Sequence, residues 1–382
     1  MLQDRFSLKD ALFNKNKVTL LAGWMQSADP GFPVRAFVSD VMARLPELEL
    51  KARIDWIAEC LIARLPPGFP DAADIVRAAL PPPLDPTRTD DDFGDFIVAP
   101  LGVVVERLGL GDPQRALDLL EDITRRFSME YSIRTFLNRW PDEVLARMED
   151  WAGHENYHVR RLVSEGTRPR LPWGQRIGIA PGRALPLLDR LHADSTRYVT
   201  RSVSNHLNDL TKSDPAAVME RVGQWRAAEL QDSKELDWMA RHALRTLVRA
   251  GDPGALEMLG YRAGAEVALI ALEVSPAVVG IGAAMEIAVT LRAARRERVI
   301  VDYSVDFARA NGRRGERVFR LKDAEIVPDR TVTFRKRHVF KADATTFSLY
   351  PGPHFLHLQL NGRRLGQVAF ELTGPERGSG TS

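Results

Sequence analysis

The chain lacks most of the features that would tie it to a disulfide network, a membrane or a metal. Its 382 residues include a single cysteine, Cys60, which excludes an intramolecular disulfide and a cysteine-based zinc site. No apolar run approaches ~18 residues, and the first ten residues, MLQDRFSLKD, lack the apolar core of a signal peptide. There is no P-loop and no metal-ligand spacing. We therefore predict a reducing, cytoplasmic location, no membrane segment, and no metal or organic cofactor.

Net charge is also nearly absent. The 53 basic and 51 acidic side chains leave a net charge of +2, so no global attraction to a polyanion is expected. The charge is nevertheless uneven: residues 1–110 contain 12 basic and 16 acidic side chains, whereas residues 281–341 contain 15 and 8. Any affinity for nucleic acid must therefore come from local surfaces.

The most unusual stretch is HENYHVRRLVSEGTRPRLPW, residues 154–173. Between residues 157 and 176 the chain has only one acid, Glu165, but five arginines: Arg160, Arg161, Arg168, Arg170 and Arg176. Apolar side chains at helical spacing predict a helix with its first two arginines beside the apolar stripe. Guanidinium groups near a carboxylate suit a surface that binds phosphate and recognises something else as well. The alternative is a surface helix with solvated arginines.

The first 110 residues predict helices separated by proline-rich breaks. Apolar residues recur at helical spacing in three segments: 12–21, 37–45 and 54–65. The proline-rich segments 65–70 and 80–86 are interpreted as stops and stiff connectors. The acidic segment TDDDF, residues 89–93, predicts a solvated turn. A metal site there is the alternative, although no histidine or second carboxylate cluster adjoins it.

An internal repeat begins after residue 112. Four prolines each open a segment with apolar residues 3, 7 and 10 positions later: Pro113, Pro141, Pro181 and Pro215. Pro253 opens a shorter copy. Proline suits the first helical position because its missing N–H needs no partner there, and Asp112, Asp214 and Asp252 are predicted caps. A second helix is predicted in each copy, at residues 131–137, 157–168, 196–212 and 235–250. Such helix pairs predict an all-α HEAT-like-repeat solenoid over residues 1–265.

One helix of every pair lines the concave face of such a solenoid. Unusual polar residues recur on the second helices: Glu130, Arg134, Arg160, Arg161, Arg197, Arg201, Asn205, Asn208, Asp209, Arg241, His242 and Arg245. We predict that they form a basic, asparagine-rich concave surface suited to the phosphates of a curved duplex. The alternative is that they form salt bridges between repeats.

After Pro276 the hydrophobic pattern alternates at period 2. Seven segments predict strands: 285–291, 299–307, 317–321, 331–334, 346–349, 355–360 and 367–372. Asn311-Gly312 and Asn361-Gly362 predict turns, and residues 276–284 predict a linker and first strand.

This pattern predicts a second domain. We expect an all-β immunoglobulin-like sandwich over residues 276–374, followed by a disordered tail at 375–382. The basic segments 313–314 and 335–338 are candidate contacts of that domain with a polyanion. The chain as a whole is therefore predicted to be multi-domain, with a solenoid followed by a sandwich.

Four segments resemble the AlkC/AlkD superfamily of HEAT-like-repeat DNA glycosylases. They are EYSIR (130–134), HENYHVRRLVSEGTRPRLPW (154–173), SVSNHLND (202–209) and RHALRTLVRAGDPGAL (241–256). The run LVSEGTRPRLPW is most similar to AlkC, and a C-terminal immunoglobulin-like domain resembles the AlkC subgroup that carries one. The resemblance implies a monomeric, cofactor-free enzyme that excises cationic N-alkylated bases, 3-methyladenine and 3-methylcytosine, from double-stranded DNA without base flipping.

The resemblance gives only part of the catalytic site. By local alignment the arginine of the AlkD branch falls on Arg161, but its aromatic positions fall near Glu130 and Asn205 and its aspartate near Arg134. The carboxylate must therefore come from elsewhere, and the candidates in order are Glu155, Glu130, Glu121 and Asp209. The predicted DNA contacts are Arg160, Arg161, Arg134, Arg168, Arg170, Arg197, Arg201, Asn205, Arg241 and Arg245.

A carboxylate has a clear task in this reaction. A base methylated at a ring nitrogen is cationic, which weakens its glycosidic bond, and the transition state places positive charge on the sugar. A carboxylate near the sugar would stabilise that charge and position a water. Two other functions stay open: a non-catalytic HEAT-like scaffold that binds bent or branched DNA or a protein partner, and a zinc or magnesium nuclease that uses Asp90, Asp91 and Asp92.

Overall fold

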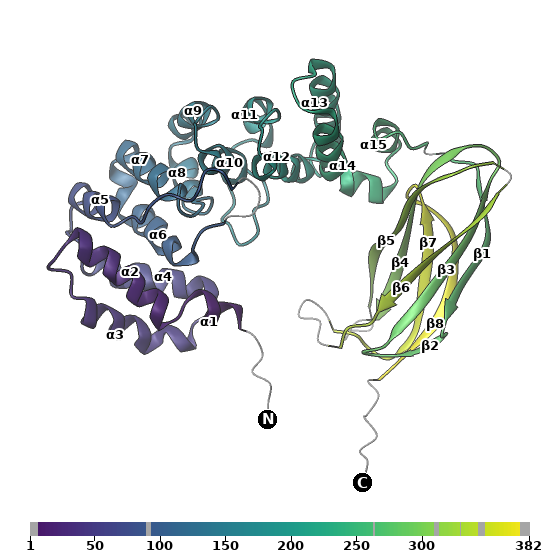
Figure 1. Ribbon diagram of the computed structural model, residues 1–382, viewed down its shortest axis with the longest axis horizontal. Helices are drawn as coiled ribbons and strands as arrows, with labels where there is room; N and C mark the ends of the chain where they lie inside the picture. The colour runs from purple at the N-terminus through teal and green to yellow at the C-terminus, as the bar shows by residue number, and fades with distance from the viewer. Residues whose placement is uncertain are drawn as a thin grey trace, which may run out of the picture. The chain divides into compact units, whose positions relative to one another are not determined.

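The chain divides into two compact units, Met1–Ala243 and Leu244–Ser382. The computed structural model describes residues 7–88, 93–262, 264–308, 313–328, 330–342 and 348–374. The first unit is helical, whereas the second contains the end of the last long helix and the strands (Figure 1). The predicted all-α region followed by an all-β domain is therefore confirmed. No helix among the described residues is both long and apolar enough to cross a membrane.

Some predicted features lie outside the described residues. They are most of the acidic segment, including Asp90, Asp91 and Asp92, the turn Asn311-Gly312, part of the predicted strand 346–349, and the predicted tail 375–382. Residues 348–349, the described end of that predicted strand, do not belong to a β-strand.

Short helices build the N-terminal part of the first unit. They are α1 (Leu8–Leu12), α2 (Lys15–Ala28), α3 (Val34–Arg44), α4 (Leu50–Ile62), α5 (Phe69–Ala78) and α6 (Ala99–Leu108). The three predicted helices correspond to α2, α3 and α4, whereas α5 and α6 lie outside the predicted segments. Pro70 and Pro100 lie in the first turns of α5 and α6, where a proline is tolerated. Prolines thus lie at the beginnings of helices here as well as in the breaks between them.

Paired helices follow, as the repeat predicts. The pairs are α7 (Pro113–Thr124) with α8 (Ile133–Arg139), α9 (Pro141–Trp151) with α10 (Tyr157–Gly166), α11 (Leu185–Leu191) with α12 (Arg197–Leu210), and α13 (Pro215–Ala228) with α14 (Ser233–Ala250); the short α15 (Pro253–Met258) comes last. Asp112, Asp214 and Asp252 each accept a hydrogen bond from a backbone N–H in the first turn that follows, which confirms the predicted caps. In Figure 1 the opening helices α9, α11 and α13 lie along one side, and α10 and α12 along the other.

Small side chains let the second helices approach closely. The hydroxyl oxygens of Ser164 on α10 and Ser202 on α12 are 3.0 Å apart and buried. At the end of α10 a Cβ added to Gly166 would lie 2.7 Å from the Ile133 side chain on α8, so only glycine fits there. Polar side chains of the second helices, such as Ser164 and Ser202, are consequently buried between repeats, whereas others face the protein surface.

The second unit contains a sandwich of two sheets. Its strands are β1 (Val267–Ser275), β2 (Val278–Gly280), β3 (Ala284–Ala293), β4 (Glu297–Ala308), β5 (Arg314–Ile326), β6 (Thr331–Val339), β7 (Gly352–Leu360) and β8 (Arg363–Thr373). One sheet has the order β1-β3-β6 and the other β2-β8-β7-β4-β5. Alternate residues of β3, β4 and β7 point into the shared core, which includes Ile287, Val301 and Leu358.

The sandwich begins one strand earlier than predicted. β1 starts at Val267 and pairs antiparallel with β3, so the boundary at residue 276 is wrong. A register shift between Leu269 and Ala271 leaves Ile270 56% exposed, and this irregularity breaks the alternation that would otherwise mark a strand. A chain ended at residue 275 would keep β1 without its partner β3.

The turn between β7 and β8 fixes the segment that follows α14. Asn361 and Gly362 both have positive φ, 46° and 75°, which confirms the predicted Asn-Gly turn. The Asn361 side chain accepts a hydrogen bond from the Ile300 backbone N–H and donates one to the Arg262 carbonyl, both at 2.8 Å. A Cβ added to Gly362 would lie 2.0 Å from the Cα of Gly251, so the two glycine backbones are in direct contact.

Candidate functional site

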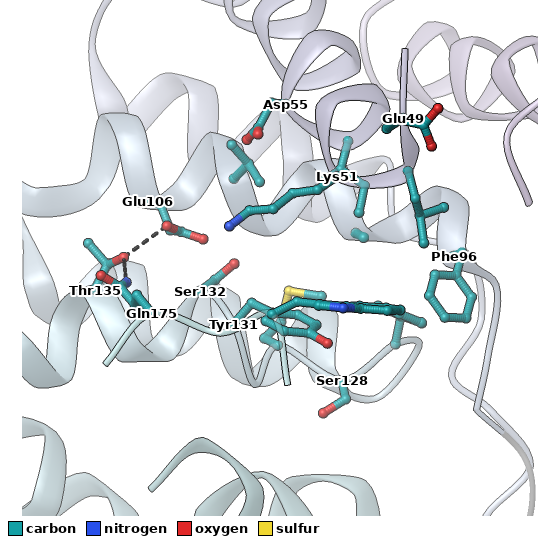
Figure 2. Close-up of a pocket in the computed structure, with 17 residues that line it drawn as sticks. Glu49, Lys51, Asp55, Phe96, Glu106, Ser128, Tyr131, Ser132, Thr135 and Gln175 are labelled. Carbon is teal, nitrogen blue, oxygen red and sulfur yellow. Dashed lines mark hydrogen bonds between the residues drawn. The ribbon is translucent and has the colours of Figure 1, made fainter. Parts of the chain in front are cut away.

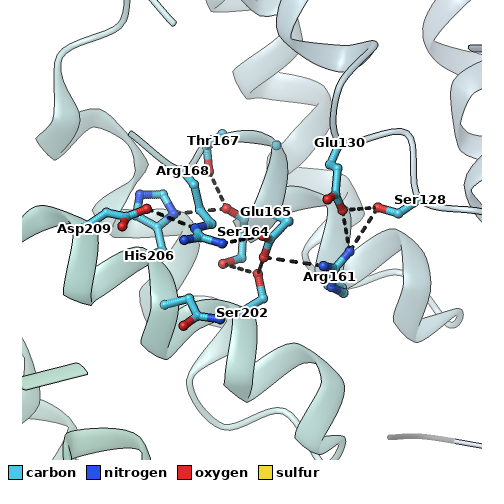
Figure 3. Close-up of polar contacts among 12 residues, drawn as sticks. Ser128, Glu130, Arg161, Ser164, Glu165, Thr167, Arg168, Ser202, His206 and Asp209 are labelled. Carbon is cyan, nitrogen blue, oxygen red and sulfur yellow. Dashed lines mark hydrogen bonds and ion pairs between the residues drawn. The ribbon is translucent and has the colours of Figure 1, made fainter. Parts of the chain in front are cut away.

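A cluster of carboxylates and guanidinium groups connects α10, α12 and the segment before α8. We call it the carboxylate–arginine cluster; its charged members are Glu130, Arg161, Glu165, Arg168 and Asp209 (Figure 3). These residues are far apart in the chain except on α10 and its C-terminal end, where three of them occur within eight positions. Folding of the helix pairs therefore brings them together.

Arg161 is held at the centre of the cluster. Its Nη1 donates to Glu130 Oε2 at 2.6 Å and to Ser128 Oγ at 3.0 Å, and Ser128 in turn donates to Glu130. The guanidinium also lies 4.6 Å from the centre of the Tyr198 ring. Burial would lower the pKa of Arg161, but the carboxylates of Glu130 and Glu165 more than offset it and the pKa is raised. The side chain is thus a fixed cation.

Glu165 bridges the two arginines. It accepts hydrogen bonds from Arg168 Nη1 at 2.5 Å and Ser202 Oγ at 2.6 Å, and it lies 3.6 Å from Arg161 Nη2. Burial would raise its pKa, but Arg161, Arg168 and the Ser202 hydroxyl together hold the pKa below its ordinary value. Glu165 is therefore an ionised carboxylate at neutral pH, although its side chain is only 6% exposed.

Arg168 closes the other end of the cluster. Its Nε donates to Asp209 Oδ2 at 3.0 Å. Behind it His206 is fully buried, with Nδ1 3.0 Å from the Ser164 carbonyl oxygen and Nε2 without a partner among the described residues. Burial, with a smaller contribution from Arg168, lowers the pKa of His206 to about 4, so its imidazole is neutral.

This neutral imidazole makes stability depend on pH. Burial lowers the pKa of both His206 and His338 to about 4, whereas an unfolded histidine titrates near 6.5. Between pH 6.5 and pH 4 the unfolded state therefore binds more protons than the folded state. The free energy of unfolding falls as the pH falls through this range, by roughly 3 kcal/mol for each of the two histidines. We expect the midpoint temperature of unfolding, measured by calorimetry, to be lower at pH 5 than at pH 7. His206→Gln should reduce the drop for the helical unit, and equal midpoints at both pH values would contradict this expectation.

The predicted carboxylates divide into three groups. Glu130 and Asp209 are members of the cluster. Glu121 lies in a separate group, where it accepts a hydrogen bond from Trp151 at 2.7 Å and pairs with Arg125 at 3.2 Å. Glu155 is exposed, and its carboxylate has no hydrogen-bond or ion-pair partner among the described residues. The first-ranked candidate thus lies outside the cluster.

The predicted DNA contact at Arg134 is wrong. This side chain is 1% exposed and donates to the backbone carbonyls of Gln175, Gly166 and Arg168 at 2.6–3.0 Å. It therefore holds the segment after α10 in place and cannot reach a phosphate. Arg160 is also engaged: it forms two hydrogen bonds with Asp194, at 2.5 and 3.1 Å. Salt bridges between repeats, the alternative left open by the sequence, account for several of these arginines.

The remaining predicted contacts are more accessible. Arg197 pairs with Glu235 and lies 3.9 Å from the centre of the Trp238 ring, and Asn205 Oδ1 accepts a hydrogen bond from His242 Nε2 at 2.8 Å. The others, Arg201 and Arg241 in the first unit and Arg245 in the second, are half-buried, whereas Arg170 is exposed. Arg170 forms no ion pair with any described residue, so its charge is available to a ligand.

Sequence reasoning missed Glu165. It is the only acid between residues 157 and 176, and its i−4 and i+3 neighbours are Arg161 and Arg168, a spacing that is also typical of a solvated helix face. The available signal was the serine-rich pattern of the next second helix: Ser202 supplies a hydroxyl to a carboxylate that would otherwise be buried without a neutral donor. The described residues contain no group of three or more His, Cys, Asp or Glu side chains that could hold a metal ion.

Comparison with known proteins agrees with the helical region followed by an immunoglobulin-like domain. Residues 268–374 match the family described as the C-terminal Ig-like domain of the uncharacterised protein YhaZ. The uncharacterised protein YhaZ of Bacillus subtilis (strain 168) is 31% identical over 365 residues, which cover 94% of this chain and 98% of the relative. The solved structure of Pseudomonas fluorescens alkylpurine DNA glycosylase AlkC, bound to DNA containing an abasic site analog, matches 96% of this chain and 100% of its own, with 34% identity and a TM-score of 0.86. Both the solenoid and the sandwich are thus shared over almost the full length, and the chain belongs to the AlkC family of HEAT-like-repeat proteins with a C-terminal immunoglobulin-like domain.

Proposed function

We propose that this chain is a monomeric DNA glycosylase that hydrolyses the N-glycosidic bond of N-alkylated bases in double-stranded DNA, as a step of base excision repair. The similarity to a DNA-bound alkylpurine glycosylase supports the activity. The observation that carries the proposal within this chain is the ionised Glu165, which shares the guanidinium of Arg161 with Glu130. Two carboxylates fixed around one cation form a rigid negative surface for a reaction that develops positive charge.

The chemistry follows from that surface. As the bond from the sugar C1′ to the base breaks, the electron pair leaves with the cationic base, which becomes neutral, and positive charge develops on the sugar. Glu165 stabilises this charge, while Glu130, oriented by Ser128 and Arg161, accepts the proton of the water that attacks C1′. The proton then passes to solvent. The products are a free base and an abasic site.

The charge balance of the cluster favours cationic substrates. Glu130, Glu165 and Asp209 contribute three negative charges, against two positive charges from Arg161 and Arg168. A base alkylated at a ring nitrogen, such as 3-methyladenine or 3-methylcytosine, carries the positive charge that this excess attracts. The five charged side chains of the cluster are 6–14% exposed. Side chains with this small exposure suit contact with a lesion that stays within its own strand. We propose that the lesion is attacked without base flipping.

Base release from methylated duplex DNA tests this function. We expect the full-length protein to release 3-methyladenine and 3-methylcytosine, measured by mass spectrometry, with no added metal and no effect of EDTA. DNA binding without release would favour a non-catalytic scaffold. Strand cleavage that EDTA abolishes would instead support a metal-dependent nuclease. Unmethylated duplex of the same sequence serves as the substrate control.

A further inference from the structure

A cavity of about 720 Å³ lies beside the carboxylate–arginine cluster, between α4, α6, α8 and the segment after α10 (Figure 2). This volume is within the range of about 300–1,000 Å³ that is usual for sites of small organic ligands. Ser128 belongs to both places: it lines the cavity and is hydrogen-bonded to Glu130 and Arg161. The cavity is therefore adjacent to the proposed reaction centre.

Aromatic side chains form much of its wall. Phe96, Phe127, Tyr131 and Trp173 all line it. Trp173 is 70% exposed and has a φ of 61°, a left-handed conformation that non-glycine residues rarely adopt. A large exposed indole held in an unfavourable backbone conformation contributes little to the core, so its packing does not explain its placement. Its ring is available to stack on a flat ligand.

Polar groups occur along one part of the cavity. Figure 2 shows the Lys51 side chain extending toward Glu106 and Ser132. Glu106 accepts a hydrogen bond from Thr135 at 2.8 Å, whereas the Lys51 ammonium has no hydrogen-bond partner among the described residues. An ammonium donor and a carboxylate acceptor therefore face the same space as the aromatic rings. A single lysine would bind a phosphate only weakly. A heteroaromatic ring fits better, because its edge carries acceptors for the Lys51 ammonium and donors for the Glu106 carboxylate.

We propose that this cavity binds a planar nucleobase, stacked on Trp173 with its polar edge toward Lys51 and Glu106. The inference rests on the proposed function, because base release beside Ser128 would deliver such a ring at the cavity. A base freed by hydrolysis and an unpaired base still attached to its strand share this chemistry. The experiment therefore treats the two sources separately.

Binding can be measured without turnover. In one arm, free 3-methyladenine is titrated into the full-length protein and detected by saturation-transfer NMR and calorimetry. In the other arm, a duplex with one bulged adenine is compared with a fully paired duplex. Trp173→Ala removes the stacking surface, and Val103→Phe fills the cavity from α6. Leu230→Ala is the matched control, because Leu230 is 69% exposed and does not line the cavity.

We expect both cavity variants to bind free 3-methyladenine about tenfold more weakly or worse, since base–aromatic stacking is worth about that factor, while Leu230→Ala binds normally. If only the preference for the bulged duplex depends on Trp173 and Val103, the cavity holds a base that is still attached to its strand. Binding unaffected by both variants in both arms would overturn the proposal. A protein that binds the base through Trp173 but releases none from DNA would overturn the proposed function and leave the cavity assignment standing.

Discussion

Replacing Glu165 with glutamine is expected to slow base release by a factor of about a hundred or more while leaving DNA binding nearly unchanged. Glutamine keeps the shape of the side chain and can still accept a hydrogen bond from Ser202, but it removes the negative charge between Arg161 and Arg168. The stabilisation of the developing sugar cation is then lost, whereas the positive charges that attract phosphates remain. Single-turnover release of 3-methyladenine at saturating protein concentration measures the effect.

Stability has to be measured alongside activity. Removing one partner of a buried ion pair typically costs about 3–5 kcal/mol, so the Glu165→Gln protein must be assayed below its own unfolding midpoint. Glu155→Gln is the matched control: it makes the same chemical change on an exposed side chain outside the cluster, and we expect release at the wild-type rate. Loss of release in Glu155→Gln with full activity in Glu165→Gln would return the role to the residue that the sequence ranked first. Full activity in both would move the role to Glu130.

Gly362→Ala is expected to destabilise the second unit by about 3 kcal/mol. The added methyl would lie 2.0 Å from the Cα of Gly251, so one backbone has to move, and overpacking of this kind typically costs about 1–3 kcal/mol. The φ of 75° adds the strain of a left-handed alanine. For a unit of this size we expect the unfolding midpoint of the sandwich to fall by about 10 °C in calorimetry.

A second glycine separates the clash from the strain. Gly282 also has a positive φ, 100°, but a Cβ added there would meet no atom within 4 Å. Gly282→Ala should therefore cost less than Gly362→Ala, because only the backbone strain remains. Equal losses in the two variants would show that the contact with Gly251 contributes nothing to stability.

The repeat architecture could be predicted because its signals are local. Each repeat is marked by a proline at the first helical position, an aspartate cap before it and an apolar stripe after it, all within about three helical turns. Asp112, Asp214 and Asp252 all cap as predicted. The strands β3, β4 and β7 could be predicted for the same reason, because alternate residues of each strand are apolar and point into the core. Where the alternation is interrupted, as at Ile270 in β1, the prediction failed.

The site could be predicted only in part, because its contacts are long-range. The role of Glu165 depends on Ser202, 37 residues away, and the partner of Arg161 is Glu130, 31 residues away. A sequence shows that Arg134 is basic, but its burial against three backbone carbonyls depends on the path of the segment after α10. Glu155 was a candidate because it lies beside a helix entrance, whereas Glu165 was not considered, and only the packing of α10 on α12 distinguishes an exposed carboxylate from an enclosed one.

The contact between Gly251 and Gly362 has a consequence for protein engineering and for recombination between relatives. A chimera that exchanges the β-domain at its first strand would join a foreign hairpin turn to a resident helix end. A side chain at position 362 would collide with the main chain of Gly251, and a side chain at position 251 would lie 3.2 Å from the main chain of Gly362. A viable crossover point must therefore lie upstream of residue 251. Both glycines of this contact are then inherited from one parent, together with the Arg262 carbonyl that accepts the hydrogen bond of the Asn361 side chain.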